Sequence, residues 1–132
     1  IPKSRNVVLT YNPKKIDPTG EQSRKLDKLR KSGVEVHEID KKDKLNPAIG
    51  INSILRGEIS AYFRTDVPCL DWGPISLIME KAGGIVTDYN GQNPDLHRYW
   101  GRTDSTKESR LPSIVVSGER QLHDTLIGVL KK

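Results

Sequence analysis

Sulfur-containing and aromatic residues are scarce in this sequence. Its 132 residues include one cysteine, Cys69, and one methionine, Met79, and aromatic residues account for 5% of the chain. A single cysteine excludes an internal disulfide and favours a reducing compartment, so we expect a cytoplasmic protein. The aromatic residues are too few and too dispersed to form a platform on which nucleic-acid bases would stack.

Long apolar runs are also absent. No segment approaches the roughly 18 consecutive apolar residues that a membrane-spanning helix needs, and no signal peptide is visible. Hydrophobic residues make up 34% of the chain and charged residues 30%, which suits a globular core with a solvated surface. We therefore expect a single domain over residues 1–132 and no membrane contact.

The net charge is positive, at +5. Basic residues are spread along the chain, apart from a cluster at 41–44. Such a surface suits either a nucleic-acid partner or plain solvation. The dispersion of the charges favours solvation, and we do not expect nucleic acid as a partner.

Short apolar segments alternate with helical patterns along the chain. Strand-like patterns occupy residues 5–12, 34–40, 60–65, 84–89 and 113–117. Helical patterns occupy residues 20–32, 46–56 and 71–82, and a last helix begins at 117 or 118. The polar segment 90–112 reads as a long loop. This alternation predicts a layered α/β fold, with helices on the faces of a sheet.

Two helix starts can be assigned from capping patterns. Thr19 and Gln22 form a possible capping box for the helix over 20–32. Asp71 opens the third helix, and the apolar spacing there predicts a buried stripe of Ile75, Ile78, Met79 and Ala82. Glu80 and Asp88 are expected to be solvated.

Asp71 has two interpretations at this position. As a helix cap, its carboxylate would accept hydrogen bonds from the amides of the first turn. As a metal ligand, it would hold a hard cation such as Mg²⁺ beside an anionic substrate, which the helix amides would also attract. The sequence pattern alone allows both.

Two further positions are candidates for binding phosphate. Asn46 and Pro47 begin a helix, whose free amides could receive phosphate oxygens. Arg64 lies near the end of a predicted strand, where it would pair with a phosphate or remain a surface arginine. The three histidines, His37, His97 and His123, are dispersed, and no two have metal-ligand spacing.

Residues 70–91 carry a family resemblance. Leu70-Asp71-Trp72-Gly73-Pro74, Glu80-Lys81-Ala82-Gly83-Gly84 and Asp88-Tyr89-Asn90-Gly91 follow one another. This order resembles the second signature of the inositol monophosphatase superfamily, Trp-Asp-x-Ala-Ala, then Glu-Ala-Gly-Gly, then Asp-x-x-Gly. Residues 57–63 are similar to the family's Gly-x-x-Asp-Ala-Tyr segment, and residues 114–123 to its closing strand and helix.

The resemblance implies a fold and an activity. It covers most of the chain, but only as the C-terminal half of a family member. We therefore expect an α/β domain with a five-stranded mixed sheet flanked by about four helices. The family consists of Mg²⁺-dependent, lithium-sensitive phosphomonoesterases, in which metal ions polarise the phosphate and generate the attacking hydroxide. By resemblance, Asp71 would bind a metal, and Arg64, Asn46 and Pro47 would face the substrate.

Three positions depart from the family pattern. Leu70 replaces the tryptophan before the aspartate, and Leu45-Asn46-Pro47 replaces a Gly-Ser/Thr-Ala element. Arg64 stands where inositol monophosphatases carry a glutamate that binds the sugar ring. These differences argue against inositol phosphate as the preferred substrate. The substrate would be a small phosphorylated metabolite, and a sugar, inositol or nucleotide phosphate all stay open.

The family's N-terminal half is also missing from this sequence. That half supplies a glutamate and an Asp-Pro-x-Asp-Gly-Thr element, which hold most of the metals. The chain starts at Ile1 and its only methionine is Met79, so we expect a processed chain or a piece of a longer protein. Alone it is expected to be inactive, with no catalytic residue of its own. Mg²⁺ binding would require the N-terminal half or a second chain, and a homodimer is a further option.

A second function from another class stays open. The chain would then be a non-catalytic descendant of the family that binds a phosphorylated ligand or a protein. The substitutions at residues 45–47, 64 and 70 fit that alternative.

Overall fold

A computed structural model describes residues 1, 7–11, 20–39, 47–93 and 110–131. The described strands are β1 (Val7–Tyr11), β2 (Glu35–Ile39), β3 (Ala61–Pro68), β4 (Ile85–Thr87) and β5 (Arg110–Ser117). The described helices are α2 (Glu21–Lys31), α3 (Pro47–Leu55), α4 (Cys69–Lys81) and α5 (Arg120–Leu130). None of these helices combines the length and the apolar character that crossing a bilayer would require.

The strands form one mixed sheet, as the sequence analysis predicted. In the described part of the chain the sheet has five strands in the order β2-β1-β3-β5-β4. β1 is parallel to both β2 and β3, whereas β5 is antiparallel to β3 and β4. The parallel strands are joined through helices that cross over a face of the sheet, as parallel connections require.

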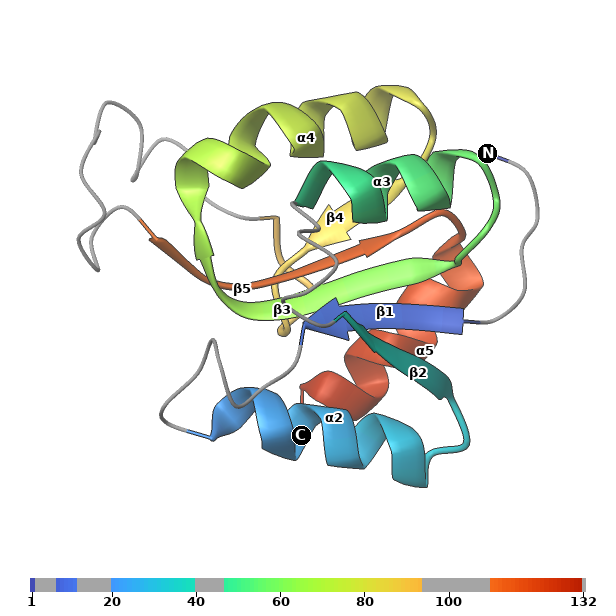
Figure 1. The fold of residues 1–132 in the computed structure, drawn as a ribbon, viewed down its shortest axis with the longest axis vertical. Helices are drawn as coiled ribbons and strands as arrows, with labels where there is room; N and C mark the ends of the chain where they lie inside the picture. The colour runs from blue at the N-terminus through green and yellow to red at the C-terminus, as the bar shows by residue number, and fades with distance from the viewer. Residues whose placement is uncertain (2–6, 12–19, 40–46, 94–109, 132) are drawn as a thin grey trace.

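The helices cover both faces of the sheet in pairs (Figure 1). α3 and α4 lie side by side on one face, and α2 and α5 lie side by side on the other. The central strands β3 and β5 therefore bury both of their sides, which explains why residues 114–116 are all apolar. The predicted α/β class, with helices on both faces of the sheet, is confirmed.

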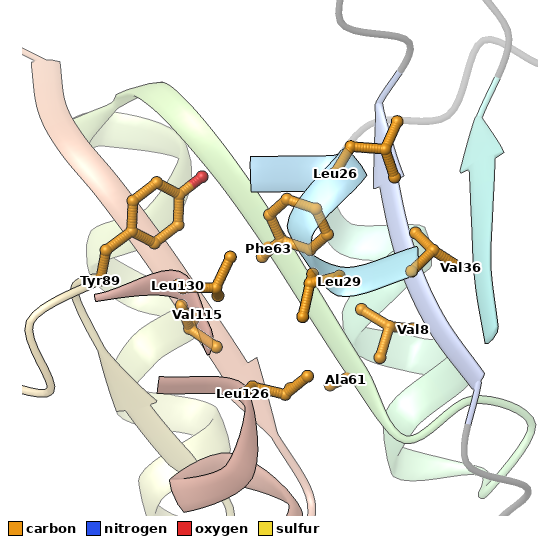
Figure 2. Close-up of a cluster of buried hydrophobic side chains, with 10 residues drawn as sticks. All are labelled: Val8, Leu26, Leu29, Val36, Ala61, Phe63, Tyr89, Val115, Leu126 and Leu130. Carbon is orange, nitrogen blue, oxygen red and sulfur yellow. The ribbon is translucent and has the colours of Figure 1, made fainter. Parts of the chain in front are cut away.

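Each face has its own apolar core, because neighbouring residues of a strand point to opposite sides. Tyr62 on β3 belongs to the core under α3 and α4, and Phe63 belongs to the core under α2 and α5. Figure 2 shows the second core, which consists of Val8, Leu26, Leu29, Val36, Ala61, Phe63, Tyr89, Val115, Leu126 and Leu130. The first core consists of Ile51, Ile54, Tyr62, Val67, Met79, Val86, Leu111, Ile114 and Val116.

The start of α4 differs from the prediction. The helix begins at Cys69, directly after β3 ends at Pro68, so Asp71 is its third residue and does not open the helix. β3 passes into α4 with no connecting residue between them, and helix ends assigned from capping patterns are often misplaced by one or two residues. The predicted strand 60–65 was correspondingly too short.

The predicted buried stripe of α4 is partly wrong. Met79 is fully buried and Ile75 packs against the core, but Ile78 is 54% exposed and Ala82 is also exposed. The small polar residue Ser76 is buried instead, at 4% exposure. Apolar residues occur all round this helix, so the sequence pattern did not specify which side faces the sheet.

The capping box predicted for α2 is also absent. Gly20 is the N-cap residue, with a φ of 79°, and none of the described side chains caps the helix. Gln22 is fully buried and its side chain bonds residues of the sheet, as described below. Thr19 lies outside the described residues.

Candidate functional site

The candidate site lies where the parallel strands end. β1, β2 and β3 point the same way, so their carboxyl ends meet at one edge of the sheet. α4 follows β3 directly, and α3 is the next described element after β2, so both helices begin at that edge (Figure 1). The crevice outside the carboxyl ends of strands is where open α/β sheets bind ligands. Two helix N-termini there provide partial positive charge.

Asp71 lies in the first turn of α4, at this edge of the sheet. Its interpretation as an N-cap is wrong in position, since two helical residues precede it. The helix dipole stabilises the negative charge of an aspartate in the first turn. The carboxylate of such a residue can also bind a cation. Its side chain lies outside the described part of the structure, so its role as a metal ligand stays a prediction.

The two glycines that follow α4 have different structural roles. Gly83 adopts a φ of +90°, the left-handed conformation that ends a helix at low cost only in glycine. Gly84 has no such requirement, but a Cβ there would lie 2.6 Å from Met79 Cε and 3.0 Å from the Ser117 carbonyl oxygen. The Gly-Gly pair of the signature therefore lets the chain turn and then pack β4 tightly against β5.

Asp88 is partly exposed and also shapes a turn, a role that was not predicted. Its Oδ1 accepts hydrogen bonds from the backbone amides of Asn90, at 2.8 Å, and Gln92, at 3.0 Å. Gly91 completes this turn with a φ of +81°. Glu80 is exposed, as predicted. The described part of the signature downstream of Asp71 therefore includes several residues that shape the backbone.

Arg64 and Pro47 belong to the same side of the sheet as α4. Arg64 is partly buried on β3 and, by strand alternation, shares the face of Tyr62 that α3 and α4 cover. Pro47 is the first residue of α3. Asn46 lies outside the described residues. The backbone thus brings residues 47, 64 and 71 to one face of the sheet, although it establishes no direct contact among them.

No metal site is formed by the described side chains alone. Among them, no three histidine, cysteine, aspartate or glutamate side chains cluster as metal ligands would. His37 is exposed and lies 2.7 Å from Glu35 Oε1. Since a single aspartate provides too few ligands for a catalytic cation, the remaining ones would have to come from residues beyond this described set.

His123 is a buried structural histidine. Thr87 Oγ1 donates to the Asp88 carbonyl, so it accepts from His123 Nε2, at 2.8 Å. His123 Nδ1 then accepts from the Ser117 hydroxyl, also at 2.8 Å. Both ring nitrogens are satisfied in the neutral form, and burial lowers the pKa of His123 to about 4. The side chain joins α5 to β4 and β5 and does not face the candidate site.

Gln22 organises a buried polar network that the sequence analysis missed. Its Nε2 donates to Thr10 Oγ1, and its Oε1 accepts from the Thr65 backbone amide at 2.8 Å. Tyr89 OH reaches the same Oε1 at 3.3 Å and lies 2.7 Å from Thr65 Oγ1. The network joins α2 to β1 and β3 below the candidate edge. Spacing could have revealed it, because Gln22 shares the helix face of Leu26 and Leu29.

A cavity of about 400 Å³ lies elsewhere, between the end of α2 and the start of α5. It is lined by Ser32, Gly33, Val34, Glu119, Gln121, Leu122 and Thr125. None of the predicted site residues belongs to it. The α2 end of this cavity lies where β2 begins, at the edge opposite the strand ends that carry the candidate site.

Solved structures of inositol monophosphatases share this fold. The chain matches the Zymomonas mobilis inositol monophosphatase over 98% of its length, with a TM-score of 0.68 and 14% identity. It matches the extragenic suppressor protein suhB of Bartonella henselae over 98%, with a TM-score of 0.67 and 20% identity. The inositol monophosphate-bound structure of SaIMPase-II also matches over 98%, with a TM-score of 0.62 and 18% identity.

The chain spans less than half of these structures. It covers 46% of the Zymomonas chain, 42% of the Bartonella chain and 43% of the SaIMPase-II chain. No family model matches the sequence. At these identities the likeness concerns the fold, and it agrees with the resemblance found in residues 70–91. The chain therefore has the fold of one part, less than half, of an inositol monophosphatase.

Proposed function

We propose that this chain is one half of a metal-dependent phosphomonoesterase that hydrolyses a small phosphorylated metabolite. The observation that carries the proposal is the position of Asp71, in the first turn of α4 at the carboxyl edge of the parallel strands. Gly83, Gly84, Asp88 and Gly91 of the signature have structural roles, and the resemblance assigns metal binding to Asp71. The shared fold with inositol monophosphatases agrees with this assignment.

The chain's own residues would contribute binding and electrostatics. The N-termini of α3 and α4 would attract the phosphate oxygens, and Arg64 would add positive charge on the same face. Asp71 would supply one carboxylate to Mg²⁺, which when bound would polarise the phosphate ester. The other ligands would come from the part of the fold that this chain does not span.

The test is Asp71→Asn in the product of the complete reading frame. We expect Mg²⁺-dependent hydrolysis of a panel of sugar, inositol and nucleotide phosphates to fall at least about 100-fold, because one ligand of the cation is lost. The thermal unfolding midpoint should stay unchanged and the Mg²⁺ concentration for half-maximal activity should rise. Glu80→Gln, an exposed carboxylate on the same helix, is the matched control and should keep full activity. Wild-type turnover by Asp71→Asn would refute the proposal.

A second candidate is a binding domain without catalysis. The partly buried Arg64 and the proline at the start of α3 favour it, because both differ from the family pattern at substrate-facing positions. Such a domain would bind inorganic phosphate or inositol monophosphate without Mg²⁺ in calorimetry. It would also show no hydrolysis in the panel above, which separates it from the enzyme.

A further inference from the structure

The sheet divides between β1 and β3 near its carboxyl edge. The register of β1 with β3 ends at Leu9 and Tyr62, whereas β1 stays paired with β2 as far as Tyr11. β3 continues to Pro68, and beyond Tyr62 it pairs with β5 alone among the described strands. The next described element after β1 is α2, on one face, and β3 leads into α4, on the other (Figure 1). Adjacent strands that diverge in this way open a crevice for ligands in α/β sheets.

Side chains bond to β3 where β1 no longer pairs with it. Thr10 Oγ1 donates to the Phe63 carbonyl oxygen at 2.7 Å, and Gln22 Oε1 accepts from the Thr65 backbone amide at 2.8 Å. Gln22 Nε2 donates to Thr10 Oγ1 and so connects the two bonds. Phe63 and Thr65 are alternate residues of β3, so their backbone groups point to the same side of the strand. The amide of Gln22 therefore acts as a peptide group of a neighbouring strand would.

Tyr89 closes this network from the β5 side. Its OH donates to Gln22 Oε1 at 3.3 Å and lies 2.7 Å from Thr65 Oγ1. Its backbone amide donates to Ser113 Oγ at 3.0 Å, and Ser113 is the β5 residue that pairs with Thr65. None of these side chains, nor Thr10, is more than 7% exposed. A buried network whose hydrogen bonds are satisfied makes its surroundings rigid, so Thr65 is fixed in position.

The network also fixes the backbone of Arg64. The Thr65 amide belongs to the peptide group that joins Arg64 to Thr65, so its bond to Gln22 holds the plane of that peptide. By strand alternation, the side chain of Arg64 lies on the opposite face of β3, which α3 and α4 cover. Because the guanidinium is at the end of a long side chain, a small rotation of the peptide would displace it from a bound phosphate.

We propose that Gln22 is a positioning residue for phosphate binding, and that it acts through the Thr65 peptide on Arg64. The inference rests on the proposed function in taking Arg64 as a residue that faces the phosphate. It goes beyond that function in assigning a role in binding to a buried network on the other side of the sheet.

The experiment uses the product of the complete reading frame. Calorimetry gives its affinity for inorganic phosphate in the presence of Mg²⁺, and steady-state kinetics gives KM and kcat for the phosphate ester that it hydrolyses best. Gln22→Met keeps the length of the side chain but removes its donor and its acceptor. We expect phosphate affinity to fall and KM to rise about 10-fold, with kcat changing less than about 2-fold, because lost uniform binding appears in KM. Tyr89→Phe, which leaves the Gln22 bond to the Thr65 amide in place, should give about a 3-fold effect.

Thr87→Val is the matched control for lost stability. It removes a buried hydrogen bond to His123, at 2.8 Å, on the same face of the sheet, but that bond joins β4 to α5 and does not reach β3. We expect it to lower the midpoint of thermal unfolding, as Gln22→Met does, and to leave phosphate affinity and KM unchanged. Equal effects of the two variants on KM would show that Gln22 is merely structural.

A double-mutant cycle tests whether Gln22 acts through Arg64. Arg64→Met alone should weaken phosphate binding by at least about 10-fold, because it removes a charged partner. In that background Gln22→Met should add less than about 2-fold, because the side chain that it positions is gone. If Gln22→Met does not fold, Tyr89→Phe is used in the cycle, and its 3-fold effect should disappear in the Arg64→Met background.

Three results would overturn the positioning role. These are additive effects in the cycle, wild-type phosphate affinity in Gln22→Met, and phosphate affinity that does not depend on Arg64. If the coupling is found in phosphate binding but no ester is hydrolysed, the positioning role stands and the phosphomonoesterase function fails. If Asp71→Asn abolishes hydrolysis and Gln22→Met changes neither KM nor phosphate affinity, the reverse holds.

Discussion

The two sides of the sheet present different surfaces to their surroundings. On the α2 and α5 side, the buried face contains a satisfied polar network around Gln22 and the outer face is charged. On the α3 and α4 side, the core is apolar but the outer face of α4 exposes Leu77 and Ile78. The first side resembles the surface of a protein in water. The second resembles an internal layer, and it is also the side to which Asp71, Arg64 and Pro47 belong.

The same division applies to the signature around Asp71. Its later residues, Gly83, Gly84, Asp88 and Gly91, have roles in a turn or a close approach within this chain. Near its start, Asp71 lies at the edge where helices begin, and the resemblance gives it a chemical role. A signature of this kind therefore combines folding requirements with chemical ones, and only a structure separates the two.

The largest expected effect tests the two sides of α4 at neighbouring positions. Met79→Ala should lower the free energy of unfolding by about 4 kcal/mol, because Met79 is fully buried between the helix and the sheet. Ile78→Ala should change it by less than about 0.5 kcal/mol in the 132-residue chain. Urea unfolding followed by circular dichroism measures both. Similar losses of unfolding free energy at the two positions would mean that Ile78 packs within this chain. The two sides of α4 would then not differ.

The next effect concerns pH and the buried side of α5. His123 has a pKa of about 4 in the folded chain and 6.5 when unfolded. At pH values between these two, the unfolded state binds more protons than the folded state. Stability is therefore complete above pH 6.5 and falls as the pH falls, by about 3 kcal/mol at pH 4. Arg120 lowers this pKa further and Asp124 opposes the shift.

Urea titrations at a series of pH values check this prediction. His123→Gln cannot titrate, so the difference between its stability and that of the wild type should shrink or change sign as the pH falls from 7 to 4. The exposed His37 stays in both proteins and serves as an internal control. A constant difference across this pH range would show that His123 is not held in its neutral form.

The smallest of these effects tests the polar network on the α2 and α5 side. Gln22→Leu leaves the buried Thr65 amide without its acceptor, which should cost about 2 kcal/mol of stability. Gln121→Leu, an exposed glutamine on α5, is the matched control and should cost nothing measurable. Chemical unfolding of the two variants gives the comparison. If Gln22→Leu costs as little stability as Gln121→Leu, water has replaced the lost acceptor.

Most elements of the fold could be predicted from the sequence, because local patterns decide them. Strand-like patterns at residues 5–12 and 34–40 predicted β1 and β2, and helical patterns at 20–32 and 46–56 predicted α2 and α3. The start of α4 was misplaced by two residues, since no connecting loop separates β3 from α4 and Asp71 matched a capping pattern. The local pattern predicted that Gln22 belongs to a capping box. Its side chain instead forms hydrogen bonds with Thr10 and Thr65 on distant strands.

The sequence by itself determined the alternation of strands and helices, the resemblance of residues 70–91 to a phosphatase signature, and Asp71 as the residue to examine. These follow from the chemistry of neighbouring residues. Only the tertiary structure decided which side of α4 faces the sheet, that His123 and Gln22 are buried partners of distant strands, and that residues 47, 64 and 71 share one face. Contacts between residues far apart in the chain depend on how the layers pack, and no local pattern specifies that packing.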